Sequence, residues 1–284
     1  MAVLYVVATP IGNLSDLTPR AAEVLKTCDL VAAEDTRVTM KLLSVLGVSK
    51  PMVSCHRHNE DNRARHLVDR MLAEDLTVAL CSDAGTPAIS DPGQFLVDEA
   101  WTAGIHVIPV PGASAVPTAL SAAGFDARKF AFFGFMPRED KALDSELTEI
   151  SKFGPGCAVL YESPHRIVKL MQAVARKFPD IRTAVMCDLT KKFERIYRGA
   201  PHSVLEELEA NANVEKGEYC VVLEMPEPVQ EEAQVKSLTC ELEILQAMLD
   251  GADMREACEA ASANWSRNEI YKAKLKIKSF LEEE

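Results

Sequence analysis

The sequence predicts an α/β protein of two domains followed by a C-terminal helical extension, and three observations lead to this prediction. Short apolar runs typical of buried strands alternate with segments of helical periodicity from residue 3 to residue 225. Polar turns that contain glycine follow several of the apolar runs. After Pro228, an acidic segment leads into residues of helical spacing. We therefore expect one α/β domain at residues 1–116, a second at 117–228 and a helical tail at 229–284.

The first domain is expected to hold a parallel sheet with helices on both faces, because strands and helices alternate along it. Ser90-Asp91-Pro92 has the pattern of a helix start, with a side-chain cap followed by proline at the first helical position. In chain order, we expect strands at residues 3–8, 30–33, 78–81 and 106–110, and helices at residues 20–27, 39–46, 62–73, 95–103 and 114–123.

In the second domain, predicted strands and helices alternate again, with segment lengths that differ from those of the first domain. Ser163-Pro164 favours a helix start over a Ser–His catalytic pair with His165, since side chains two residues apart rarely meet there. We expect strands at residues 130–135, 158–161, 183–189, 190–199 and 219–225, helices at 137–151, 162–177 and 201–210, and tail helices between 236 and 281.

Composition restricts the class of protein. No apolar run approaches the roughly 18 residues that span a bilayer, so no membrane segment is expected. The first residues lack the basic region of a signal peptide, and the eight cysteines form no C-x-x-C pair, which together favour a reducing cytoplasm. A net charge of −12 argues against general nucleic-acid binding but is compatible with a local basic patch.

Three glycine-containing loops mark the expected binding site. They are Thr9–Leu14, Ser82–Pro87 and Pro111–Ala115, and each follows a predicted strand. None has the spacing of a dinucleotide fingerprint, a P-loop or a hydrolase nucleophile elbow. Because carboxyl ends of parallel strands meet at one edge of a sheet, we expect the three loops to bind a small polar cofactor together.

A metal site is not predicted. His56 and His58 with Glu60 include ligand types used by zinc, but their spacing on an extended segment is weak support and no further His or Cys cluster accompanies them. A polar loop is the preferred interpretation.

Several motifs in order resemble the ribosomal RNA small subunit methyltransferase I family, which has the tetrapyrrole methylase, or class III methyltransferase, fold. The resemblance covers about residues 2–225, with a weaker match in the helical tail. The motifs are Thr9-Pro-Ile-Gly-Asn-Leu14, Ala33-Glu-Asp-Thr-Arg37, Ser82-Asp-Ala-Gly-Thr-Pro87, Asp91-Pro-Gly93, Tyr161-Glu-Ser-Pro-His-Arg166 and Thr190-Lys with Glu194.

This resemblance implies a homodimeric enzyme that binds S-adenosylmethionine between its two domains. It implies 2′-O-methylation of a cytidine ribose in the 16S rRNA of the small ribosomal subunit. The cofactor-binding residues implied by the family are Pro10, Asp83, Gly85, Thr86, Ser114, Ala115, Tyr161 and Leu189.

Basic residues near the predicted strand ends are expected to offset the acidic net charge and contact RNA: Arg20, Arg37, His56, His58, Arg166 and Lys192. For catalysis, Asp35 is the candidate proton acceptor, and Lys191 with Glu194 the candidate electrostatic helper. A helix cap at Asp35 and a surface ion pair between Lys191 and Glu194 are equally compatible with the sequence.

Two other functions remain open at the level of sequence. A methylase of small tetrapyrrole precursors would share the fold, and the basic residues argue against it. A non-catalytic RNA-binding or assembly factor would lack affinity for S-adenosylmethionine.

Overall fold

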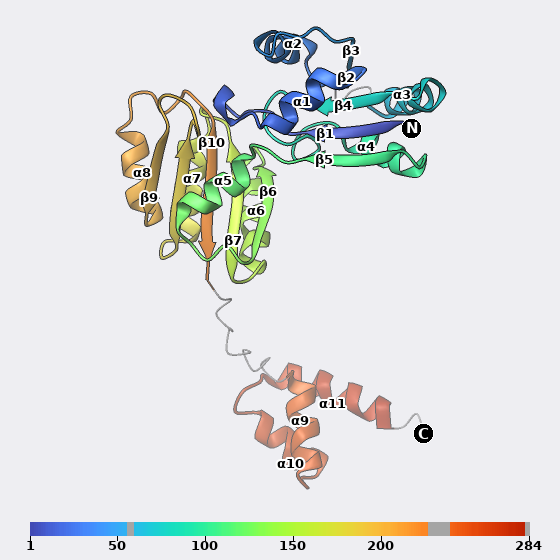
Figure 1. Cartoon of the computed structure of the whole chain (residues 1–284). Helices are drawn as coiled ribbons and strands as arrows, with labels where there is room; N and C mark the ends of the chain where they lie inside the picture. Colours follow the sequence, from blue (N-terminus) through green and yellow to red (C-terminus); the bar gives the residue numbers. More distant parts are fainter. Residues whose placement is uncertain (56–59, 227–238, 282–284) are drawn as a thin grey trace. The chain divides into compact units, whose positions relative to one another are not determined.

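The computed structural model describes residues 1–55, 60–226 and 239–281, and the predicted RNA contacts His56 and His58 lie outside these residues. The chain forms two compact units, Met1–Glu227 and Pro228–Glu284. The first unit contains two five-stranded sheets, and the described part of the second unit is helical (Figure 1).

The first sheet has the strand order β3-β2-β4-β1-β5, and all of its neighbouring strands run parallel. This confirms the predicted parallel sheet. The edge strand β3 is absent from the prediction, because three residues are too few for strand periodicity to show. The strands are β1 (Val3–Val7), β2 (Leu30–Ala33), β3 (Met52–Ser54), β4 (Thr77–Cys81) and β5 (His106–Val110).

Helices cover both faces of this sheet. Leu4 and Leu80 pack with residues of α3 and α4 on one face, while Val7 and Ala79 pack with residues of α1 and α2 on the other. Burial on both sides explains why Leu30–Ala33 is apolar at every position. The helices are α1 (Pro19–Thr27), α2 (Thr36–Val45), α3 (Glu60–Glu74) and α4 (Gln94–Thr102), with a short 3-10 helix η1 (Leu14–Asp16) before them.

The structure explains the starts of two helices that cover the first sheet. Helix α2 begins at Thr36, because the Asp35 carboxylate caps it by accepting a hydrogen bond from the backbone N–H of Arg37. Helix α4 begins after Gly93, which has a φ of 128° and provides no side-chain cap. The predicted cap at Ser90-Asp91-Pro92 is therefore wrong, and these residues form a loop before the helix.

The second sheet has the order β6-β7-β10-β8-β9 and is mixed. Strands β6 and β7 are parallel, whereas β10 runs antiparallel to both β7 and β8, and β9 antiparallel to β8. Consequently β6, β7 and β8 end, and β9 and β10 begin, at the same edge. The strands are β6 (Phe130–Phe135), β7 (Gly156–Glu162), β8 (Arg182–Cys187), β9 (Arg195–Gly199) and β10 (Tyr219–Met225).

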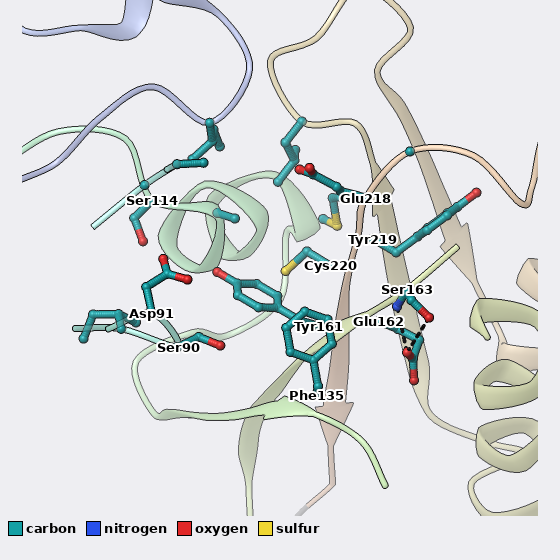
Figure 2. A pocket seen from close by; sticks show the side chains of 18 of the residues that line it. Ser90, Asp91, Ser114, Phe135, Tyr161, Glu162, Ser163, Glu218, Tyr219 and Cys220 are labelled. Atoms are coloured by element: carbon teal, nitrogen blue, oxygen red, sulfur yellow. Dashed lines mark hydrogen bonds between the residues drawn. The ribbon is translucent and has the colours of Figure 1, made fainter. Parts of the chain in front are cut away.

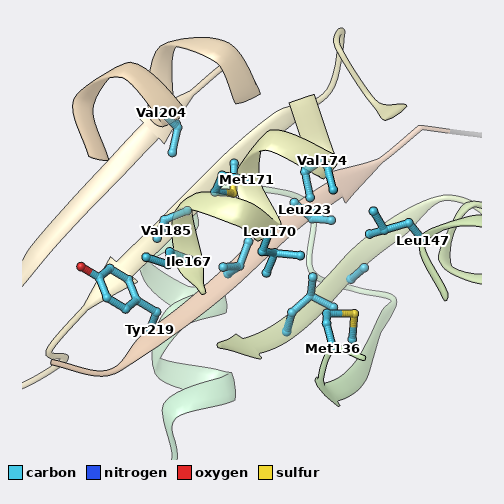
Figure 3. Close-up of a cluster of buried hydrophobic side chains, with 14 of the residues drawn as sticks. Met136, Leu147, Ile167, Leu170, Met171, Val174, Val185, Val204, Tyr219 and Leu223 are labelled. Atoms are coloured by element: carbon cyan, nitrogen blue, oxygen red, sulfur yellow. The ribbon is translucent and has the colours of Figure 1, made fainter. Parts of the chain in front are cut away.

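One face of the second sheet carries the largest apolar cluster among the described residues. Ile167, Leu170 and Val174 of one helix pack against Val185 and Leu223 of the strands (Figure 3). The helices on this face are α6 (Asp140–Lys152), α7 (Ile167–Lys177) and α8 (Pro201–Glu209). Helix α7 starts at Ile167 rather than at Ser163-Pro164, so the predicted Ser-Pro helix start is wrong.

Helix α5 (Ala115–Ala123) connects the two sheets. It follows β5 of the first sheet but lies against the second sheet (Figure 1). Its residues Val116, Ala119 and Leu120 pack with buried residues of β7, β8 and β10. The helix begins at the edge of the first sheet where β5 ends, and its apolar face covers the second sheet. The helix therefore holds the loop edges of the two sheets next to each other.

The described part of the second unit consists of α9 (Cys240–Leu249), α10 (Met254–Ala261) and α11 (Arg267–Leu281) around a small apolar core. Helix α10 begins with a capping box formed by Asp253 and Glu256. Within the described residues of the whole chain, no helix combines the length and apolar character needed to cross a membrane.

Candidate active site

A pocket of about 380 Å³ lies between the loop edges of the two sheets. Its first wall comes from loops after β1, β4 and β5, and includes Ile11, Gly85, Thr86, Ser90, Asp91 and Ser114. Its second wall comes from the edge where β6 to β8 end and β10 begins, and includes Phe135, Tyr161, Glu162, Leu189, Glu218 and Cys220. The volume falls within the usual range for small-molecule sites.

The loops around the pocket are conformationally strained. Positive φ angles occur at Ala88 and Ser90 in the loop between β4 and α4, and at Asp188 and Thr190 in the loop between β8 and β9. Among the described non-glycine residues, the only other one with a positive φ is Asp75. Such conformations cost about 1–3 kcal/mol each and cluster at functional sites, so their position supports the pocket as the site.

Backbone hydrogen bonds hold the first wall together. The N–H of Thr9 donates to the carbonyl of Gly85 at 2.8 Å, and the N–H of Gly85 donates back at 3.0 Å. Gly85 has a φ of 80°, which favours glycine at this position. The loops after β1 and β4 thus form one continuous surface.

Charged side chains hold the second wall together. Glu162 has 1% of its side chain exposed and accepts hydrogen bonds from the backbone and hydroxyl of Ser163 and from Arg166. The Arg166 guanidinium also donates to the carbonyls of Met136 and Pro137, which follow β6. Arg166 therefore fixes the end of β6 to the end of β7, a structural role that differs from the predicted RNA contact.

The pocket favours a cationic or neutral ligand. Its charged lining residues are Asp91, Glu162 and Glu218, and the described residues that line it include no lysine, arginine or histidine. Phe135 and Tyr161 add aromatic surface, with ring centroids 5.7 Å apart. Arg166 and Lys191 partly offset the charges of Glu162 and Glu218, but the lining itself offers carboxylates and aromatic rings, which favour a cation.

Tyr161 contributes a polar group inside the pocket. Its hydroxyl points toward the region of Asp91 and Ser114 (Figure 2). Burial raises the pKa of this hydroxyl, and the negative charge of the Asp91 carboxylate adds to the shift. The hydroxyl is therefore neutral at physiological pH and available to donate a hydrogen bond.

Lys191 joins the two walls. Its ammonium lies 3.2 Å from the Asp188 carboxylate and 3.1 Å from the Glu218 carboxylate. Its aliphatic chain covers Gly12 of the first wall so closely that a Cβ at Gly12 would lie 2.5 Å from Lys191 Cγ. Burial by itself would lower the pKa of Lys191, but hydrogen bonds and attraction from Glu218 and Asp188 outweigh it and raise the pKa. Lys191 is a fixed cation beside the pocket.

Asp35, the candidate proton acceptor, caps α2 and forms an ion pair with Arg37 at 2.6 Å. Hydrogen bonds from the Arg37 side chain and backbone hold the pKa of Asp35 at about 2. A carboxylate with so low a pKa is a weak base at neutral pH. Asp83 lies next to it, and its carboxylate accepts a hydrogen bond from the Asp35 backbone N–H at 3.0 Å.

The predicted cofactor residues divide into two groups. Those that line the pocket are Gly85, Thr86, Ser114, Ala115, Tyr161 and Leu189. Pro10 and Asp83 are not among the lining residues, and Asp83 instead binds the backbone at the start of α2. Burial raises the pKa of Asp83, which is consistent with a carboxylate turned toward the protein.

The remaining predicted residues are not among those that line the pocket. Glu194 accepts a hydrogen bond from the Thr190 backbone, so it closes the loop between β8 and β9 rather than pairing with Lys191. Arg20 and Lys192 are exposed, and Arg37 has 83% of its side chain exposed while paired with Asp35. These three side chains are accessible to a macromolecule.

Sequence reasoning missed several lining residues, chiefly Ser90, Asp91, Phe135, Glu218 and Cys220. Asp91 belongs to a recognised motif but was interpreted as a helix cap. Glu218 precedes β10 and Cys220 is its second residue. The start of a strand reaches the binding edge here because β10 runs antiparallel to β7. The sequence signal that could have indicated these residues is a glycine followed by a carboxylate, Gly217-Glu218, directly before an apolar strand.

Comparison with known proteins places the chain in a family. The profile of the Tetrapyrrole (Corrin/Porphyrin) Methylases matches residues 3–204. A protein of Bacillus subtilis named ribosomal RNA small subunit methyltransferase I is 39% identical over 278 residues, which cover 96% of this chain and 94% of that protein. Its namesake in Vibrio cholerae is 44% identical over 222 residues, covering 78% of this chain and 76% of that protein.

Solved structures share the fold at low sequence identity. Diphthine synthase superposes with a TM-score of 0.61 at 16% identity, covering 78% of this chain and 90% of that one. Uroporphyrin-III-C-methyltransferase of Thermus thermophilus superposes with a TM-score of 0.52 at 20% identity, covering 82% and 98% respectively. The chain therefore belongs to the tetrapyrrole methylase family and, within it, to the ribosomal RNA small subunit methyltransferase I proteins.

Proposed function

We propose that this protein uses S-adenosylmethionine to methylate the 2′-oxygen of a cytidine ribose in the 16S rRNA of the small ribosomal subunit. The observation that carries the proposal is the pocket between the two sheet edges, with its acidic and aromatic lining. The names of the curated relatives support small-subunit rRNA as the substrate class. The choice of a cytidine and of its 2′-oxygen as the methylated atom is part of our proposal.

The residues present fit the cofactor. When bound, S-adenosylmethionine supplies a methyl group on a positively charged sulfonium, which is already an activated electrophile. Asp91 and Glu218 provide negative charge in the pocket, and Phe135 and Tyr161 provide apolar surface for the adenosine. Gly85 keeps the loop compact at the first wall. A dinucleotide or nucleoside triphosphate would instead place phosphates against carboxylates.

Lys191 is the residue best placed to assist the attack by the ribose. Its ammonium is protonated and held by Asp188 and Glu218, the second of which lines the pocket. A preorganised cation stabilises the negative charge that develops on an oxygen as its proton leaves. Asp35 stays a weaker candidate for the proton acceptor, because its pKa of about 2 disfavours proton transfer to it.

Exposed basic side chains support RNA as the macromolecular substrate. Arg20 and Arg37 lie at the starts of α1 and α2, which follow strands of the first sheet, and Lys192 lies in the loop between β8 and β9. Contacts to phosphates would make affinity fall as salt is raised. We further propose that the protein acts as a cytoplasmic homodimer. In this proposal, residues 1–116 and 117–228 form the two domains that bind the cofactor, and residues 229–284 form the helical tail.

The decisive test is nucleoside mass spectrometry of 16S rRNA from cells with and without the protein. We expect one 2′-O-methylcytidine to disappear in its absence and to return when purified protein, S-adenosylmethionine and small subunits from those cells are combined. Unchanged methylation in the cells without the protein would refute the proposal. Calorimetry with S-adenosylmethionine separates an enzyme from a non-catalytic assembly factor.

Methylation of a small tetrapyrrole precursor is the second candidate, because the family profile includes enzymes named for it. The structural neighbour of that kind is 20% identical and supports the fold alone. Transfer of labelled methyl groups to a uroporphyrinogen or cobalamin precursor, with none to small subunits, would favour this function.

A further inference from the structure

An exposed aromatic ring stands on the loop between β8 and β9. Phe193 is 72% exposed, more than any other aromatic residue in the described part of the first unit. A single exposed apolar side chain is ordinary on a protein surface. Three features of its surroundings make this one different: the rigidity of its loop, a cation against its ring and its place beside the pocket.

The loop that carries Phe193 is closed by several hydrogen bonds. The Lys191 N–H donates to the Asp188 carbonyl at 2.9 Å, and the Glu194 N–H donates to the Lys191 carbonyl at 3.1 Å. The Glu194 carboxylate accepts from the Thr190 N–H. Asp188 and Thr190 hold positive φ angles inside this network. A ring presented on so constrained a loop loses little conformational freedom when a ligand binds.

A cation lies beside the ring. The Lys192 ammonium lies 5.4 Å from the ring centroid. Within the described residues, no carboxylate lies within ion-pair distance of Lys192 or Arg195. Residues 190–195 contain three basic residues and one acidic residue in a chain whose net charge is −12. A flat apolar face with cations beside it suits a nucleobase joined to a phosphate.

The loop also forms part of the pocket surroundings. Leu189 lines the pocket, and Lys191 binds Glu218, which lines it as well. Because the pocket lies between two loop edges, a ribose enters it more easily from an unpaired, unstacked nucleotide than from within a helix. Unpaired RNA bases commonly stack on aromatic side chains when proteins bind them.

We propose that Phe193 and Lys192 form a base-stacking subsite for the unpaired RNA segment that carries the target ribose. The Phe193 ring stacks on a nucleobase of that segment, and the Lys192 ammonium contacts its phosphate. This inference rests on the proposed function, because it assumes an RNA substrate at the pocket.

Steady-state methylation of small subunits from cells lacking the protein tests the subsite. Phe193→Ala is expected to raise KM for the subunits by about 5- to 150-fold, the range found for loss of one stacked base. Turnover at saturating substrate and the Kd for S-adenosylmethionine stay within twofold of the parent protein. Phe193→Tyr restores KM to within about threefold, because its ring still stacks.

The matched control is Trp101→Ala. Trp101 is 62% exposed and lies at the end of α4, at the edge of the first sheet opposite the pocket, so its loss leaves KM unchanged. Lys192→Ala lowers the slope of log affinity against log salt by about one unit, whereas Phe193→Ala leaves that slope unchanged.

Two results would overturn the subsite. One is a KM for Phe193→Ala within twofold of the parent protein. The other is a loss of thermal stability and cofactor affinity that Phe193→Tyr fails to restore, which would assign the ring a structural role. If the parent protein binds S-adenosylmethionine but methylates no rRNA, the proposed function itself fails, and this outcome is distinct from both.

Discussion

The first wall of the pocket is held by backbone hydrogen bonds, whereas the second wall is held by charged side chains. In the first wall, Thr9 and Gly85 pair through their own N–H and carbonyl groups. In the second wall, Arg166 reaches the chain 30 residues earlier, and Asp188 contacts the chain 30 residues later. The first arrangement depends on turn geometry, and the second depends on the charge of individual side chains.

This difference suggests different tolerance to substitution. A wall built from backbone bonds survives most side-chain changes as long as its glycines remain. A wall built from buried ionic groups is sensitive to the loss of one partner, because the other is left without compensation. Substitutions on the two walls can test the comparison directly.

The largest effect is expected at Glu162. Glu162→Ala removes the acceptor of three hydrogen bonds and leaves the half-buried Arg166 without its carboxylate, at a cost of about 3–5 kcal/mol in the free energy of unfolding. Denaturant unfolding measures it. Thr9→Val is the matched change on the first wall, where the lost hydroxyl bond to Ser82 costs about 1 kcal/mol. Equal costs would contradict the contrast between the walls.

The next largest effect concerns Lys191 and turnover. Lys191→Met keeps the aliphatic contact with Gly12 but removes the cation, and single-turnover methylation should slow by about 100-fold, as for other preorganised oxyanion donors. Calorimetry should find the Kd for S-adenosylmethionine changed far less. A matched Lys191→Arg protein retains most of the rate if charge is what matters, and normal turnover in Lys191→Met would exclude the role.

Each wall contains a glycine with a positive φ, so the effect of adding a Cβ at such a glycine can be compared between the two walls. Gly217→Ala places a Cβ 2.6 Å from the Asp188 carboxylate, whereas Gly85→Ala places one 3.4 Å from Ile11. Both substitutions carry about 1–2 kcal/mol of left-handed strain. Gly217→Ala should cost about 1 kcal/mol more, since it also displaces an ion-pair partner of Lys191. Equal shifts in urea midpoint would show that the side-chain contact is unimportant.

A smaller effect distinguishes the carboxylates of the first wall. Asp91→Asn should weaken binding of S-adenosylmethionine by about 1.5–3 kcal/mol, because Asp91 lines the pocket. Asp83→Asn should weaken it much less, since the Asp83 carboxylate contacts the Asp35 backbone instead. Calorimetry measures the Kd for S-adenosylmethionine of both variants. A larger loss of affinity in Asp83→Asn than in Asp91→Asn would show that Asp83 belongs to the binding site.

The smallest effect is the pH dependence at Asp35. Its pKa is about 2 in the folded protein, below the value near 3.9 of an unfolded aspartate. Its contribution to stability is therefore present above about pH 4 and is lost as pH falls toward 2. Asp35→Asn should consequently lose less stability than the parent protein across that interval. Carboxyl NMR should also find Asp83 titrating above Asp35, since burial raises the pKa of Asp83.

The sequence by itself determined the first sheet and much of the first wall. Short buried runs such as Leu30–Ala33 and Val78–Cys81 mark parallel strands because both faces are covered, and this pattern is local. The loops after β1, β4 and β5 contain turn-forming residues at the strand ends, so the sequence predicted these loops as a binding edge, while the family resemblance implied Gly85, Thr86 and Ser114 within them, which line the pocket. The order of motifs was enough to indicate the family.

The tertiary structure alone decided the second wall and the roles of its charged residues. The reversed direction of β10 brings Glu218 and Cys220 to the pocket, and strand direction is not encoded in local periodicity. Arg166 donates a hydrogen bond to the carbonyl of Met136, a contact that exists only when the end of β6 lies beside the start of α7. Lys191 became a link between the walls through contacts with Gly12 and Glu218, which are distant in sequence. Such contacts exist only once the sheets are assembled, since their energy depends on burial and distance rather than on neighbours in the chain.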